Sequence, residues 1–173
     1  MDIKLNYREQ GDGYPLILLH GNGEDSSCFR HQLEYFSKEY RVIAIDTRGQ
    51  GESPRGTAPF TFEQFAQDLE DFMDEHGIFR ANILGFSDGG ITALIFALTR
   101  PERVNKLILK AWLSPYAQRF RKKRRKLRRL RTKVPKTCNV MKTCALWQSS
   151  PLSIRRSFPR SKLLLWLLWA RRI

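Results

Sequence analysis

The sequence changes character abruptly after Glu102. All 17 of its Asp and Glu residues lie at or before that position, with nine of the 31 Lys and Arg residues, while the other 22 follow it. Neither glycine nor histidine occurs beyond Glu102. The formal charge is therefore −8 for residues 1–102 and +22 for residues 103–173. A wholly basic segment repels itself and gains no internal ion pairs, so the two parts are not expected to share one folded core.

Only residues 1 to about 110 carry the hydrophobic patterning of a folded domain. An alternating segment over Lys4–Arg8 suits a strand near the edge of a sheet. Four apolar runs have the length and composition of buried parallel strands. These runs are Leu16–His20, Arg41–Asp46, Ala81–Phe86 and Lys106–Lys110.

Helical patterns separate these strands. Ser26–Lys38 opens with serines that are expected to cap it, and Phe62–Glu75 spaces its apolar residues along one face. Gly89–Thr99 is nearly all apolar and stops before a proline. The alternation of strand and helix predicts an α/β fold with a parallel sheet and right-handed crossovers.

Three polar loops follow three of the predicted strands. They are H-G-N-G-E-D (His20–Asp25), D-T-R-G-Q-G-E-S (Asp46–Ser53) and G-F-S-D-G-G (Gly85–Gly90). Open α/β sheets place their sites at the carboxyl ends of strands, where these loops fall. In the third loop, Ser87 lies between a strand and an apolar helix, and its glycine neighbours allow a strained, closely packed turn.

In this order and spacing the loops resemble the α/β-hydrolase family, whose nucleophile elbow is similar to Gly85–Gly90. The resemblance covers residues 1 to about 110 and implies a partial α/β-hydrolase sheet with flanking helices. It implies that Ser87 is the nucleophile and that the backbone N–H groups of Asn22 and Asp88 form the oxyanion hole. It gives His20, Gly21, Gly85 and Gly89 structural roles in the loops, and it implies no cofactor and no metal.

The family places its catalytic acid after a later strand and its histidine near the end of the chain, but no Asp, Glu or His follows Glu102. We therefore expect a truncated, esterase-like serine hydrolase that lacks turnover, whose intact relatives hydrolyse small acyl substrates. In the intact fold the sheet continues beyond Lys106–Lys110. This strand is therefore expected to be an exposed edge, which favours self-association or aggregation.

Several polar residues of this part have more than one interpretation. His20 is either a substitute base or, as in related hydrolases, a support for the oxyanion loop, and the second reading is favoured. His31 and His76 lie on polar helical stretches and are expected to be solvated. Asp46 and Arg48 are expected to pair with each other and stabilise their loop.

Residues 111–173 are predicted to form a second region, a basic and disordered tail. The run Arg119–Lys133 fits either an anion-binding patch or a solvated, disordered segment. Phe120 is its only aromatic residue, which favours the second interpretation, although weak binding to polyanions follows in both cases. The alternative function is a non-catalytic protein that presents a nucleic-acid-binding tail.

The genetic code suggests an origin for this tail in another reading frame. Read one base earlier, the codons of Trp169 and Ala170 force a glycine, and those of Arg172 and Ile173 permit an aspartate three positions later. The shifted text then resembles the family strand that carries the catalytic acid. A single shift between about Leu109 and Arg119 would account for the missing acids and the excess of arginine.

The remaining composition points to a cytoplasmic protein. Three cysteines, Cys28, Cys138 and Cys144, match no disulfide framework and no zinc site. The first ten residues do not resemble a signal peptide. The longest apolar run, Leu163–Ala170, is far shorter than the roughly 20 residues that span a bilayer, so no membrane span is expected.

Overall fold

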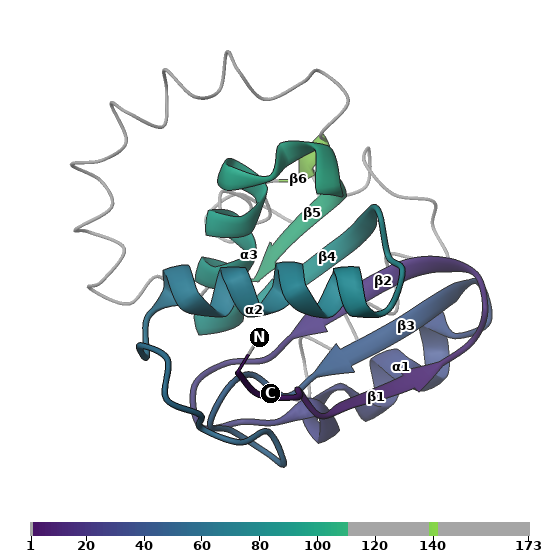
Figure 1. Cartoon of the computed structure of the whole chain (residues 1–173). Helices are drawn as coiled ribbons and strands as arrows, with labels where there is room; N and C mark the ends of the chain where they lie inside the picture. The colour runs from purple at the N-terminus through teal and green to yellow at the C-terminus, as the bar shows by residue number, and fades with distance from the viewer. Residues whose placement is uncertain (1, 111–138, 142–173) are drawn as a thin grey trace, which may run out of the picture. The chain divides into compact units, whose positions relative to one another are not determined.

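The computed structural model describes residues 2–110 and 139–141, which form a six-stranded sheet in the order β1-β3-β2-β4-β5-β6 (Figure 1). β1 runs antiparallel to β3, and every other neighbouring pair is parallel. The strands are β1 (Tyr7–Gln10), β2 (Tyr14–Leu19), β3 (Tyr40–Ile45), β4 (Ala81–Phe86), β5 (Val104–Lys110) and β6 (Asn139–Met141). The predicted α/β class is confirmed, with one antiparallel strand at the edge.

Among the described residues, three α-helices and two 3₁₀ turns lie between the strands. They are η1 (Ser26–Phe29), α1 (Arg30–Phe36), α2 (Phe62–Glu75), α3 (Asp88–Thr99) and η2 (Pro101–Arg103). The structure reproduces the predicted bounds of α2 and β4. The expectation that serines cap the helix beginning at Ser26 is wrong: the Asp25 side chain caps η1 by accepting from the Ser27 N–H, and α1 begins after Phe29 without a side-chain cap.

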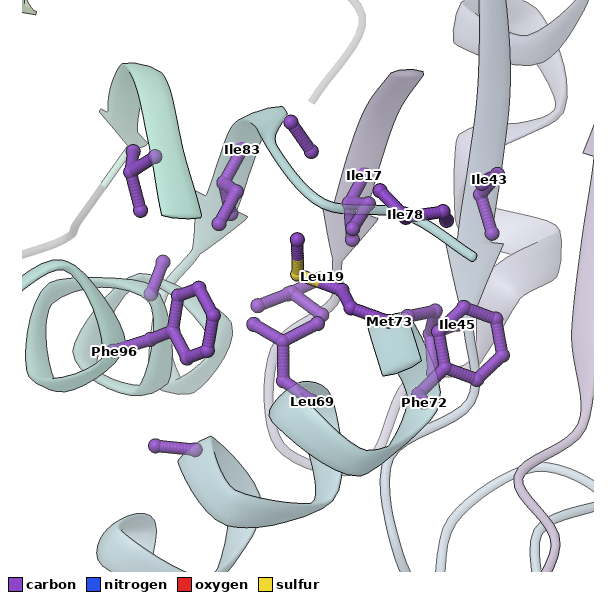
Figure 2. Packing of buried hydrophobic residues seen from close by; sticks show 14 of the residues in the cluster. Ile17, Leu19, Ile43, Ile45, Leu69, Phe72, Met73, Ile78, Ile83 and Phe96 are labelled. Atoms are coloured by element: carbon purple, nitrogen blue, oxygen red, sulfur yellow. The ribbon is translucent and has the colours of Figure 1, made fainter. Parts of the chain in front are cut away.

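The alternation of side chains along the strands builds a hydrophobic core on each face of the sheet. On one face Ile17, Ile43 and Ile83 pack with the buried sides of α2 and α3 (Figure 2). On the other face Leu18 and Val42 pack with residues of η1 and α1. Because both faces of the central strands are covered, β2 and β3 are apolar at successive positions rather than at every second one.

β6 corrects the expectation that β5 is an exposed edge. The short strand pairs with β5 in parallel, with Lys106 opposite Asn139 and Ile108 opposite Met141. Within the described residues, the edges of the sheet are therefore β1 and β6. β6 was not expected, because a strand of three residues is too short for a hydrophobic period to be recognised in the sequence.

A buried guanidinium fixes the loop after β3. Arg48 is 1% exposed and donates to both carboxylate oxygens of Asp68 on α2, at 2.7 Å each. Asp2 accepts a further hydrogen bond from the same group at 2.6 Å. The expected pairing of Arg48 with Asp46 is therefore wrong, since the loop is anchored to α2 and to the N-terminal segment instead.

In the part of the chain that the structure describes, no helix combines the length and the apolar character that crossing a bilayer requires.

We expect Asp68→Ala to lower the free energy of unfolding by about 3 kcal/mol, because removing one partner leaves a buried charge that Asp2 only partly compensates. Urea unfolding followed by circular dichroism measures this change. Glu75→Ala is the matched control: it removes an exposed carboxylate from the same helix, and a change within about 0.5 kcal/mol is expected. Equal effects of the two substitutions would contradict the anchoring role of Arg48.

Candidate functional site

The three polar loops meet at one end of the sheet. β3, β2 and β4 are neighbours and run parallel, so their carboxyl ends lie side by side. Each of these ends continues directly into one loop, at His20, Asp46 and Ser87. The arrangement brings together residues that lie up to about 70 positions apart in the sequence.

Ser87 forms a strained turn between β4 and α3. Its φ of 49° and ψ of −114° make it the one residue other than glycine with a positive φ among those described. Its N–H donates to the Lys110 oxygen at 2.9 Å, and its own oxygen accepts from the N–H of Gly90 at 2.9 Å. Such a backbone is unfavourable by about 1–3 kcal/mol and persists only where surrounding bonds hold it. The side chain is half-buried and lies at the amino end of α3.

Two glycines allow this turn to pack closely against the sheet. A Cβ on Gly89 would lie 2.3 Å from the Leu19 oxygen, and a Cβ on Gly85 would lie 2.4 Å from the Gly89 oxygen. Both separations are shorter than van der Waals contact, and both involve backbone atoms that cannot move aside. Any side chain at either position would therefore push α3 away from β2 and β4.

His20 connects all three loops. Its main-chain oxygen accepts from the Gly89 N–H at 3.0 Å, and its ring Nε2 accepts from the Thr47 N–H at 3.0 Å. Ring Nδ1 lies 2.7 Å from the Gly21 oxygen and must donate to it, because a carbonyl has no hydrogen to give. The imidazole is thus neutral, and it is only 1% exposed.

The loop after His20 turns back on itself beside Ser87. The Glu24 N–H donates to the Gly21 oxygen, and the Glu24 carboxylate accepts from the Gly21 N–H at 2.9 Å. Asn22 is exposed at the tip of this turn. Asp88 is the first residue of α3, and burial raises the pKa of its carboxyl group. The two residues whose N–H groups were expected to form an oxyanion hole therefore lie on the two loops that His20 joins.

Asp46 braces the neighbouring loop. Burial opposes its charge, yet hydrogen bonds from the Asn6 side chain and from the N–H groups of Glu52 and Ser26 outweigh burial and lower its pKa. A Cβ on Gly51 would lie 2.4 Å from the Asp46 carboxylate, so the loop closes tightly around it. All of these contacts fix loop geometry.

None of the three histidines lies in position to act as a base for Ser87. The described residues contain no hydrogen bond between Ser87 and any of them; His20 uses both ring nitrogens, and His31 is exposed on α1. His76 is half-buried and stacks on Phe72 with ring centroids 4.0 Å apart, so the expectation that it is solvated is wrong. Over the same described ranges, no group of three His, Cys, Asp or Glu side chains could hold a metal ion.

Two charged residues beside Ser87 were not singled out in the sequence. Glu24 contacts Gly21, and Lys110 ends β5 with its ammonium 5.5 Å from the centre of the Phe86 ring. Burial lowers the pKa of Lys110 to about 8, against the opposing effect of Glu24. For Lys110 the sequence held one indication of a place near the site: a charged residue directly follows the apolar run Leu107–Leu109 at the carboxyl end of a strand.

Comparison of this sequence with known proteins identifies the family to which it is similar. A family model described as the alpha/beta hydrolase fold matches residues 14–149. Epoxide hydrolase 4 of Mus musculus is 37% identical over 111 residues, which cover 62% of this chain and 31% of that protein. 3-Oxoadipate enol-lactonase 2 of Acinetobacter baylyi is 36% identical over 110 residues, which cover 62% and 41%. The chain thus spans less than half the length of these curated relatives.

Solved structures agree with the sequence comparison. The enol-lactonase from Burkholderia xenovorans LB400 aligns with a TM-score of 0.58 at 34% identity, over 61% of this chain and 42% of that one. A marine microorganism esterase aligns with a TM-score of 0.60 at 30% identity, over 73% and 51%. Since the family model matches residues 14–149, which are most of the sequence, this chain belongs to the α/β-hydrolase fold family.

Proposed function

We propose that Ser87 is the nucleophile of an esterase-like acyl-transfer site. The observation that supports this most strongly is the strained backbone of Ser87 at a strand-to-helix turn, held by bonds from two neighbouring segments. Such a turn presents a serine oxygen to a substrate at the carboxyl edge of the sheet. The N–H groups of Asp88 and Asn22 would stabilise the negative oxygen that forms when Ser87 attacks a carbonyl.

The substrate class in this proposal is a small ester, lactone or similar acyl compound. The relatives' names range from epoxide hydrolase to enol-lactonase, so they do not agree on one reaction. A serine nucleophile favours the acyl compounds, because its attack on a carbonyl yields an acyl-enzyme that water then releases. The intact relatives, rather than this chain, would complete that cycle.

We further propose that this chain is the amino-terminal part of such a hydrolase, followed by a basic tail of out-of-frame origin. Two facts support this: the chain spans 31–41% of its relatives' lengths, and no Asp, Glu or His follows Glu102. Sequencing of the gene tests the origin of the tail. A long open frame, one base out of register downstream, is expected, and its absence would favour a selected tail.

We expect the full chain to show no measurable turnover of 4-nitrophenyl acetate above buffer, because Ser87 lacks a histidine that could accept and return its proton. Loss of the histidine alone lowers turnover in a serine protease by on the order of 10⁶-fold. Steady-state release of 4-nitrophenolate measures this, with Ser87→Ala as the matched control. Turnover that disappears in Ser87→Ala would show that the chain is a working hydrolase.

The second candidate, a nucleic-acid-binding protein, has one supporting observation: 22 Lys and Arg residues without a single acid after Glu102. We expect binding to duplex DNA that is independent of sequence and falls by about 10³-fold or more between 50 and 200 mM salt, as for six or more phosphate contacts. Fluorescence anisotropy on two unrelated duplexes measures both properties. A strong preference for one duplex that persists at 200 mM salt would favour this second function over the hydrolase.

A further inference from the structure

The loop after His20 contains a four-residue turn, Gly21–Glu24. The Glu24 N–H donates to the Gly21 oxygen at 3.3 Å and closes the turn. Gly23 has a φ of 75°, whereas Asn22 before it has no positive φ, and this combination is that of a type II β-turn. A Cβ on Gly23 would meet no atom within 4 Å, so the backbone conformation rather than space calls for glycine there.

Side chains bind the two glycine amides of this turn. The Gly21 N–H donates to the Glu24 carboxylate at 2.9 Å, and the Gly23 N–H donates to the side-chain oxygen of Gln50 at 2.6 Å. No hydrogen bond among the described residues uses the N–H of Asn22, which lies between them. The turn therefore holds the amides on both sides of Asn22 and leaves the Asn22 amide free.

The Gly21 oxygen fixes the direction of this free amide. It accepts from the Glu24 N–H at 3.3 Å and from His20 Nδ1 at 2.7 Å. The described residues contain no cis peptide bond, so the Gly21 oxygen and the Asn22 hydrogen point in opposite directions from one planar group. The Asn22 N–H thus faces away from the imidazole. Gly21 itself lies beside the elbow, because a Cβ on it would be 3.2 Å from the Ser87 Cβ.

The two side chains that bind the turn differ in strength. Glu24 is half-buried, and a hydrogen bond to a carboxylate is roughly twice as strong as one to a neutral acceptor. The bond from Gly23 to Gln50 is exposed and neutral, so water competes with it. Gln50 also donates to Thr47 Oγ1 at 3.0 Å, which connects the turn to the loop after β3. Glu24 is therefore expected to have the larger effect on the turn.

We propose that Glu24, assisted by Gln50, is a positioning residue that holds the Asn22 N–H as a free donor for an oxyanion beside Ser87. This inference rests on the proposed function, in which that N–H stabilises the oxygen formed during attack by Ser87. Glu24 acts through its hydrogen bond, because its negative charge alone would oppose an anion at the same place. The bond and the charge thus have opposite effects on anion binding, and substitutions can separate them.

Hydrogen exchange of the full chain, resolved by NMR, tests the hold on the turn. Relative to its intrinsic rate, the Gly21 amide is expected to exchange at least about tenfold more slowly than the Asn22 amide, because only the Gly21 amide must first break a hydrogen bond. Glu24→Ala should remove this protection. Glu24→Gln should retain it, because the amide oxygen of glutamine also accepts a hydrogen bond. Gln50→Ala should speed exchange at Gly23 alone.

Titration with methylphosphonate, a small tetrahedral anion, tests the donor without any proton transfer. Saturable shifts of the Asn22 and Asp88 amide resonances are expected at constant ionic strength. Glu24→Ala should raise the dissociation constant by about fivefold or more, because the donor is no longer held in place. Glu24→Gln should leave it unchanged or lower it, since the hydrogen bond remains and the repelling charge is gone.

Glu52→Ala is the matched control, because it removes an exposed carboxylate from the loop after β3. It should change neither the exchange at Gly21 nor, by more than about twofold, the dissociation constant, since the effect of an exposed charge is screened by salt. Circular dichroism confirms that each variant is folded.

The outcomes distinguish the inference from the proposed function. Asn22 and Asp88 amides that do not respond to methylphosphonate in the unsubstituted chain would show that the proposed oxyanion hole is wrong, and the role of Glu24 would fail with it. A response that Glu24→Ala leaves unchanged would overturn the role of Glu24 alone. Tighter binding in both Glu24→Ala and Glu24→Gln would show that Glu24 acts only through its charge, which also overturns the inference.

Discussion

The candidate site depends on the hydrogen bonds that His20 makes through its main-chain oxygen and its imidazole ring. One residue accepts from the elbow through its carbonyl, donates to the Gly21 oxygen through Nδ1 and accepts from Thr47 through Nε2. Each bond reaches a different loop, so the relative positions of the loops follow from the position of a single ring. The same engagement removes His20 from proton transfer, because both of its nitrogens are already used.

In a serine hydrolase, the attacking oxygen and the groups that transfer its proton come from different parts of the chain. The proposed nucleophile and the N–H groups proposed to face a developing oxyanion all come from the loops after β2 and β4, and the hydrogen bonds of His20 join these loops. Proton transfer in the family comes from residues that follow later strands. Among the described residues, Glu24 lies beside Ser87 at the Gly21 turn, and Lys110 lies over the Phe86 ring.

The sequence predicted those elements in which apolar residues form a clear helical face or an unbroken strand-length run. The apolar face of Phe62–Glu75 and the apolar run Ala81–Phe86 gave α2 and β4 with their observed ends. β1 begins three residues later than expected, because its register is set by pairing with β3 rather than by its own alternation. The partners of Arg48 could not be read from the sequence, since Asp68 and Asp2 are 20 and 46 positions away. Ser87 and its loops were found from their motif, whereas Glu24 and Lys110 belong to the site only because β2, β4 and β5 end side by side.

The bonds that hold the elbow have a consequence for where this protein is most rigid. The Ser87 N–H is bound to β5, and the Gly89 N–H is bound to the end of β2. These two amides become free only when the turn separates from β5 and α3 separates from the end of β2, which also disturbs the core around Phe96 and Ile83. Hydrogen exchange at these two positions would therefore report the opening of the whole sheet rather than a local fluctuation. Loops that carry active sites usually belong to the least stable part of a fold, whereas this turn belongs to its most cooperative unit.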